Sequence, residues 1–143
     1  MPTRPSRPAS RTVLAAATVV AAVATAGSLW LSLGLGLTPC RLCWYQRILL
    51  YPLVVVLGVA ALADRPGVWR TALPLAVPGA GVAAYHSLLQ ASAVSGSTCS
   101  VAVGCATIQY ALAGGLLTVP RLSLVAFLLV TVGLLVVARR SAA

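Results

Sequence analysis

The sequence predicts an all-α membrane protein, a bundle of four transmembrane helices. Of its 143 residues, 60% are hydrophobic and only 8% are charged, with Asp64 as the sole acidic residue. No water-soluble domain has this balance. Four apolar segments are each near the length needed to cross about 30 Å of hydrocarbon at about 1.5 Å per residue. We place these spans at about residues 13–37, 45–63, 71–91 and 122–138.

A single domain is expected, because four spans in a chain of this length leave only short connections. It covers residues 13–140, after a Pro/Arg/Ser-rich cytoplasmic tail at 1–12 and before a short tail at 141–143. The first apolar segment also resembles a secretory signal peptide, with Ala-Thr-Ala at residues 24–26 as its cleavage site. The apolar run continues to Leu37, which is longer than a signal peptide needs, so we favour a retained span.

Two segments are expected to depart from a straight helix. The third apolar segment contains Pro74 and Pro78, each of which removes a backbone donor and crowds the preceding turn. We therefore expect this helix to be kinked or locally opened. Residues 106–119 are weakly apolar and contain Gly114 and Gly115, so this connection is predicted to be a mobile flap or a short interfacial helix.

The placement of arginine predicts the orientation. The formal charge of +9 comes from ten arginines and one acid. Seven arginines precede the first span, separate the second from the third, or follow the fourth, which predicts that both termini are cytoplasmic. These are Arg4, Arg7, Arg11, Arg65, Arg70, Arg139 and Arg140, against Arg41, Arg47 and Arg121 on the other side. The arginines form no basic stripe, so nucleic acid is not an expected partner.

Four cysteines lie on the side predicted to be extracytoplasmic, which is the oxidising side. Cys40 and Cys43 form a Cys-x-x-Cys pair just before the second span, and Cys99 and Cys105 lie between the third and fourth spans. A two-residue spacing can bring two sulfurs close enough to join. The small residues between Cys99 and Cys105 allow that loop to close a disulfide and also to move toward the other pair. Two dithiols on adjacent outer loops make a relay of disulfide exchange possible.

The residues around Cys40 favour a reactive thiol. Thr38 is the expected N-cap of the second helix and Pro39 its first residue, which places Cys40 in the first turn. There the helix dipole and Arg41 stabilise a thiolate.

Structural disulfides and a four-cysteine zinc site are the main alternatives for these residues. Zinc clusters of this type usually serve reducing compartments or stabilise soluble domains that lack a core. Neither condition applies outside a four-span bundle, so no metal is expected.

Residues 39–52 read PCRLCWYQRILLYP, which resembles the signature of the DsbB family of membrane disulfide-forming proteins, particularly its short BdbC-type branch. The resemblance extends to residues 85–90 (YHSLLQ) and to Cys105 followed by residues 117–120 (LTVP). It implies an enzyme of the bacterial cell membrane, a protein-disulfide-forming quinone oxidoreductase that serves protein folding.

The resemblance also implies roles for the cysteines. A thioredoxin-fold, DsbA-like partner would attack a Cys99–Cys105 disulfide, and the electrons would pass to the pair formed by Cys40 and Cys43. A membrane quinone, either ubiquinone or menaquinone, would reoxidise that pair. Cys43 would face the quinone and Cys40 would exchange with the loop pair, while both Cys99 and Cys105 remain candidates for the mixed disulfide with the partner.

Arg47, His86 and Trp44 are the candidate quinone-binding residues by the same resemblance. Each also has an ordinary structural interpretation. Arg47 can anchor in lipid headgroups, His86 can be a hydrogen-bonded bundle residue, and Trp44 can belong to the aromatic belt at the membrane surface. Trp30, Trp69 and Tyr110 are assigned to that belt. Gln46 stands where some relatives have an acid, so a role for that acid does not carry over.

A vitamin K epoxide reductase-like enzyme is a further alternative, since that family combines a quinone, four helices and two cysteine pairs. In that family the quinone-side pair follows the loop pair. Here the Cys-x-x-Cys comes first, which favours the DsbB-like interpretation.

Overall fold

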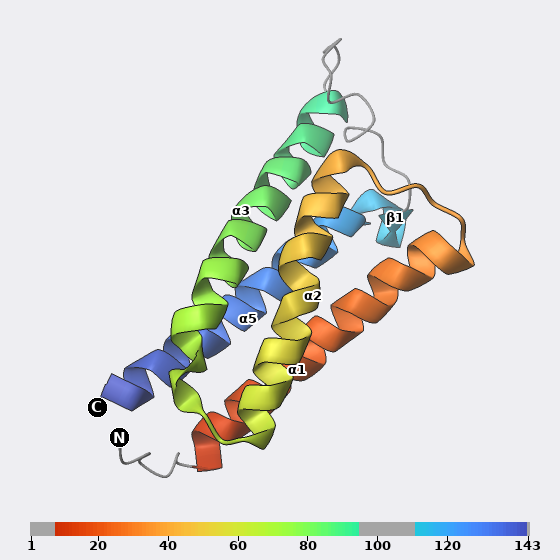
Figure 1. Ribbon diagram of the computed structural model, residues 1–143. Helices are drawn as coiled ribbons and strands as arrows, with labels where there is room; N and C mark the ends of the chain where they lie inside the picture. The colour runs from red at the N-terminus through yellow and green to blue at the C-terminus, as the bar shows by residue number, and fades with distance from the viewer. Residues whose placement is uncertain (1–7, 95–110, 143) are drawn as a thin grey trace.

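Four long helices dominate the computed structural model, which describes residues 8–94 and 111–142 (Figure 1). They are α1 (Pro8–Leu29), α2 (Arg41–Leu62), α3 (Trp69–Val94) and α5 (Val119–Ala142). A π-helical turn, η1 (Trp30–Gly34), extends α1, and a 3-10 turn, η2 (Pro66–Val68), leads into α3. Counting these turns, all four helices are long and apolar enough to cross a membrane. The predicted fold class is confirmed, with helix ends that differ from the expected spans by a few residues.

The helices pack in a ring. α1 lies against α2 and α5, and α3 lies against the same two helices, whereas α2 and α5 make little contact. Figure 1 shows the start of α1, the η2 connection and the end of α5 at one end of the bundle. The start of α2 lies at the opposite end, together with the segment that joins α1 to it.

Apolar side chains occupy both the interior and the outer faces of the bundle. The largest buried ones include Leu14, Leu53, Leu57, Phe127 and Leu134. Valine and leucine side chains are exposed along the outer faces of all four helices, as at Val19, Val59, Val77, Leu128 and Val132. Lipid chains solvate such a surface, and each helix satisfies its own backbone hydrogen bonds, so this arrangement suits a membrane bundle.

Helix α3 is continuous through Pro74 and Pro78. The local opening that was one of the two expectations is therefore wrong, whereas the kink stays a prediction. A proline removes one backbone donor, and the loss is tolerated in a membrane helix that packs on its neighbours. Gly79 follows directly and meets the ring of Phe127 on α5, so a small residue allows the two helices to approach closely here.

A small hairpin precedes α5. Strand β1 (Ala111–Leu112) pairs antiparallel with β2 (Leu117–Thr118), and the 3-10 turn η3 (Ala113–Gly115) connects them. Gly114 and Gly115 have φ values of 70° and 93°, which glycine adopts without steric cost. Over its described part, the connection is thus a hairpin and not the interfacial helix that was one expectation. Cys99, Cys105 and Tyr110 lie outside the described residues.

Candidate functional site

Cys40 caps the N-terminus of α2. Its backbone is extended, with φ −72° and ψ 172°, and its Sγ accepts a hydrogen bond from the Cys43 N–H at 3.4 Å. Its carbonyl accepts the first helical bond, from the Trp44 N–H at 3.1 Å. These are the features of an N-cap residue, so the expectation that Thr38 is the cap is wrong. The thiol takes the capping role, and the helix begins one residue after Cys40.

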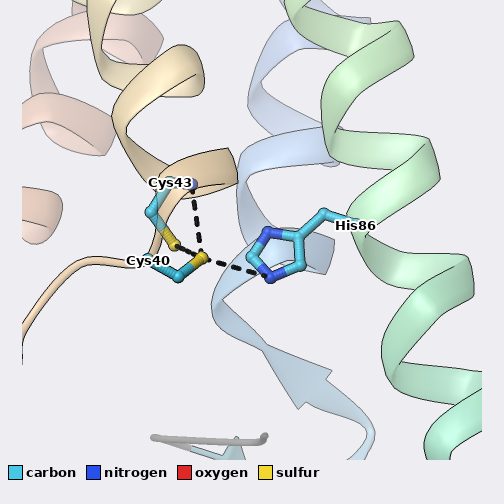
Figure 2. A group of neighbouring side chains, drawn as sticks. All are labelled: Cys40, Cys43 and His86. Atoms are coloured by element: carbon cyan, nitrogen blue, oxygen red, sulfur yellow. Dashed lines mark hydrogen bonds between the residues drawn. The ribbon is translucent and has the colours of Figure 1, made fainter. Parts of the chain in front are cut away.

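The two sulfurs of the Cys-x-x-Cys pair face each other. Cys40 Sγ and Cys43 Sγ lie 3.1 Å apart, and both residues are half-buried (Figure 2). The thiol of Cys40 donates to the sulfur of Cys43. The pair can close to a disulfide with little movement, and the N–H groups of the first helical turn, one of which donates to Cys40 Sγ, favour negative charge on its sulfurs.

His86 reaches the cysteines from α3 (Figure 2). Its ring is buried, with 2% exposure, and its Nε2 lies 3.8 Å from Cys40 Sγ. On its other side, Nδ1 lies 3.1 Å from the amide Nε2 of the buried Gln46. In this arrangement the amide nitrogen donates to Nδ1, and the ring carries its proton on Nε2, facing Cys40. Gln46 and His86 therefore connect α2 to α3 directly behind the dithiol.

Arg47 ties the start of α2 to the end of α1. Its Nη2 donates to the backbone oxygen of Ser28 at 2.8 Å and to the hydroxyl of Ser32 in η1. Its guanidinium also lies over the ring of Trp44, 5.6 Å from the centroid. Trp44 itself is 53% exposed.

A cavity of about 630 Å³ adjoins the dithiol. Side chains of all four helices line it, and most of them are apolar, including Val20, Leu31, Leu50 and Leu129. The polar lining consists of Cys40, Cys43, Gln46, Arg47, His86 and Gln90 together with three serines. Concave, mainly apolar sites with a few convergent polar groups are typical of small-molecule binding.

The structure places four of the candidate site residues on the wall of this cavity, namely Cys40, Cys43, Arg47 and His86. Trp44 does not belong to the residues that line it, and Trp30 lies there instead. The quinone-binding roles of Trp44, Arg47 and His86 stay predictions, as do the catalytic roles of the four cysteines.

No binding role for Gln46 or Gln90 is predicted from the sequence. A signal for both exists in their spacing. Gln46 follows Cys43 by three residues and Gln90 follows His86 by four, so each lies one helical turn from a site residue on the same face. Trp30 has no such signal, because the π-helical turn that carries it is not visible in the sequence pattern.

Cys40, Cys43 and His86 also form a set of metal-type donors. Their two sulfurs and one ring nitrogen all lie within 4.8 Å of one another. Thiolate and imidazole are ligands that soft transition metals prefer.

Four membrane-spanning helices with a dithiol beside an apolar cavity define a multi-pass membrane protein of thiol–disulfide chemistry. Comparison with known proteins shows the family of the chain. The family described as "Disulfide bond formation protein DsbB" matches residues 10–137, and the chain belongs to that family.

Several curated relatives are similar over most of their length. The "Disulfide bond formation protein C" of Bacillus subtilis (strain 168) is 42% identical over 121 residues, which is 83% of this chain and 87% of that protein. A "Probable disulfide formation protein" of Metapseudomonas resinovorans is 34% identical over 86% of this chain and 87% of its own length. One from Deinococcus radiodurans is 40% identical over 78% and 79%, respectively. No solved structure matches the chain significantly. The protein is therefore a disulfide-forming oxidoreductase of the membrane.

Proposed function

We propose that this protein reoxidises an extracytoplasmic thioredoxin-fold, DsbA-like protein and passes two electrons to a membrane quinone. The observation that carries the proposal is the pair of sulfurs 3.1 Å apart on the wall of a mainly apolar cavity of about 630 Å³. A dithiol in this position is next to a space suited to a lipid-soluble oxidant. Membership of the DsbB family supports a thiol protein as the electron donor.

The electrons move by two disulfide exchanges. The partner's dithiol attacks the Cys99–Cys105 disulfide, so the partner becomes oxidised and the loop pair is reduced. The loop dithiol then attacks the disulfide of Cys40 and Cys43, which regenerates the loop disulfide and leaves Cys40 and Cys43 as thiols. Each exchange transfers two electrons and forms one disulfide for each one broken. Following the family resemblance, Cys40 receives the attack and Cys43 faces the acceptor.

The cavity fits a quinone. Its apolar part suits an isoprenoid tail, and Arg47, His86 and Gln90 supply polar groups suited to the oxygens of a head group. A bound quinone would supply an acceptor for two electrons and two protons. The chain's own contribution is to hold Arg47 through Ser28 and Ser32, which positions a fixed positive charge beside the cavity. His86 Nε2–H stabilises negative charge on Cys40.

We also propose that the protein lies in the bacterial cell membrane with both termini in the cytoplasm. The described arginines support this orientation. Arg11, Arg65, Arg70, Arg139 and Arg140 lie at or next to the helix ends of one end of the bundle, the end to which the positive-inside rule assigns the cytoplasm.

Anaerobic thiol counting tests the oxidase. The full-length protein carrying Cys99→Ser and Cys105→Ser is purified in detergent, reduced, and mixed with ubiquinone or menaquinone in the presence of EDTA. We expect two thiols to disappear for each quinone reduced, with an absorbance change that follows quinone consumption. The additional substitution Cys43→Ser is expected to abolish both the loss of thiols and the reduction of quinone.

A second arm adds a reduced DsbA-like protein to the oxidised wild-type protein. We expect the partner to be oxidised in proportion to the quinone supplied, and to accumulate a mixed disulfide when either Cys99 or Cys105 is replaced by serine. The oxidase proposal is wrong if quinone leaves both thiols of the reduced pair intact. It is also wrong if the Cys43→Ser protein still oxidises the partner.

A further inference from the structure

We propose that the reduced form of this protein has a second binding activity: Cys40, Cys43 and His86 bind one soft metal ion of the zinc or cadmium class. The ligand set is two thiolates and one imidazole. It differs from a four-cysteine site, because it uses a histidine from α3 and needs neither Cys99 nor Cys105.

The distances approach those of a tetrahedral site. Zinc bonds of about 2.3 Å to sulfur and about 2.0 Å to nitrogen place neighbouring ligand atoms roughly 3.5–3.8 Å apart. Cys40 Sγ and His86 Nε2 are 3.8 Å apart, and the two sulfurs are slightly closer than required, at 3.1 Å. The third pair of atoms lies within 4.8 Å. Small side-chain rotations of the cysteines are enough to surround an ion.

The surroundings of the three residues also suit a metal. All three line the cavity, so the fourth coordination position is open to water or another small ligand. Metal-bound histidines usually donate their second N–H to a neighbouring acceptor. Gln46 lies 3.1 Å from His86 Nδ1 and can accept through its amide oxygen after a half-turn of the amide. The same side chain can therefore support the metal-bound tautomer and the metal-free one.

Binding depends on the redox state of the pair. A divalent ion displaces the two thiol protons and leaves the oxidation state of every atom unchanged, whereas a disulfide offers no thiolate to the ion. Metal binding thus selects the reduced dithiol. One consequence rests on the proposed function: a bound ion holds both sulfurs apart as thiolates and blocks their reoxidation by quinone.

Cobalt binding tests the site directly, because Co²⁺ in a thiolate site gives intense sulfur-to-metal absorption. The full-length protein is reduced in detergent, freed of reductant without oxygen, and titrated with Co²⁺. We expect one Co²⁺ per chain, with thiolate bands that disappear on adding excess Zn²⁺. The oxidised protein is expected to show no bands until it is reduced.

Five variant proteins distinguish this site from the alternatives. Replacing Cys40 or Cys43 with serine should remove most of the thiolate absorption, and His86→Gln should weaken Co²⁺ binding at least tenfold. The double variant Cys99→Ser with Cys105→Ser should bind as the wild type does. Ser87→Ala is the matched control, because Ser87 adjoins His86 in the chain but its hydroxyl bonds only to the Ala83 carbonyl among the contacts observed. It should also bind normally.

Three results would overturn the inference. The first is an absence of thiolate bands in the reduced wild type, and the second is unchanged affinity in the His86→Gln protein. The third is loss of the bands in the Cys99→Ser, Cys105→Ser protein, which would indicate a four-cysteine site. Oxidation of the dithiol by quinone is measured separately, in the presence of EDTA. A failure to bind Co²⁺ therefore leaves the oxidase proposal intact, and a failure to react with quinone leaves the metal site intact.

Discussion

At the scale of single residues, the dithiol depends on a buried polar pair behind it. Gln46 on α2 and His86 on α3 lie 3.1 Å apart, and His86 Nε2 faces Cys40 Sγ at 3.8 Å. A buried imidazole and a buried amide are costly in a membrane bundle unless they bond to each other or to a functional group. Here Gln46 and His86 bond to each other, and the Nε2–H of His86 points at Cys40 Sγ.

The first prediction concerns the thiolate of Cys40. In a protein whose other three cysteines are replaced by serine, His86→Ala is expected to slow alkylation of Cys40 by iodoacetamide at pH 7 about tenfold. The reason is that a hydrogen bond to a charged group contributes about 1.5–3 kcal/mol. Gln46→Met should slow the alkylation of Cys40 less, because the imidazole of His86 remains although Gln46 no longer fixes its tautomer. Ser87→Ala serves as the control, and equal rates in the His86→Ala and control proteins would refute the role of His86.

The second prediction concerns how Arg47 is held. Ser32→Ala removes a hydroxyl acceptor of its guanidinium, whereas Ser28→Ala leaves the main-chain acceptor in place. If Arg47 positions the quinone, Ser32→Ala should raise the quinone KM several-fold, since one hydrogen bond contributes about 1 kcal/mol. The kcat should change little, and Ser28→Ala should have a smaller effect. Steady-state quinone reduction measures both constants, and identical KM values for the two variants would contradict this role.

At the scale of elements, close contact between helices depends on small residues. The α3 and α5 helices meet at Gly79, where an added Cβ would overlap the ring of Phe127. Dispersion and close backbone approach drive helix association in lipid, because burial of apolar surface provides no comparable force there. A single methyl group at such a contact therefore matters more than its hydrophobicity suggests.

The third prediction tests that contact. Gly79→Ala is expected to destabilise the bundle by about 1–3 kcal/mol, because the extra methyl group forces α3 away from α5. Gly81→Ala is the matched control on the same helix, since an added Cβ there meets no atom within 4 Å. It should be neutral or stabilising by up to about 1 kcal/mol, because alanine favours the helix. Thermal unfolding in detergent compares the two, and equal midpoints would show that the α3–α5 contact is looser than described.

At the scale of the whole molecule, the reactive end and the arginine-rich end lie at opposite ends of the bundle. The dithiol stands at the start of α2, whereas Arg139 and Arg140 end α5 at the other end. A chain with this charge distribution is expected to insert with its dithiol on the extracytoplasmic side.

The fourth prediction tests this orientation. In intact cells under reducing conditions, a membrane-impermeant maleimide should label Cys40 in a protein that has no other cysteine. A cysteine introduced at the end of α5, Ser141→Cys, should be labelled only after the membrane is permeabilised. The reverse pattern would invert the proposed topology and separate the dithiol from extracytoplasmic partners.

Much of this protein follows from local sequence properties. Apolar segments of membrane-spanning length predict four helices because the bilayer requires both that length and internal backbone bonding. The Cys-x-x-Cys pair is equally local, because only two residues lie between its cysteines. By contrast, the capping role of Cys40 depends on one hydrogen bond at the start of α2, and Thr38-Pro39 offers an equally good pattern with its cap two residues earlier.

The tertiary structure decides how distant residues combine. Gln46 and His86 are forty positions apart, and no spacing rule predicts that their side chains meet behind Cys40. Contacts between helices likewise decide that α3 meets α5 at Gly79 and Phe127 and that α3 stays continuous through two prolines. The hairpin before α5 depends on the backbone angles of its glycines. Periodicity and composition indicate which residues avoid water. In a membrane bundle, where most helix faces are apolar, these patterns do not determine which face of one helix packs against which neighbouring helix.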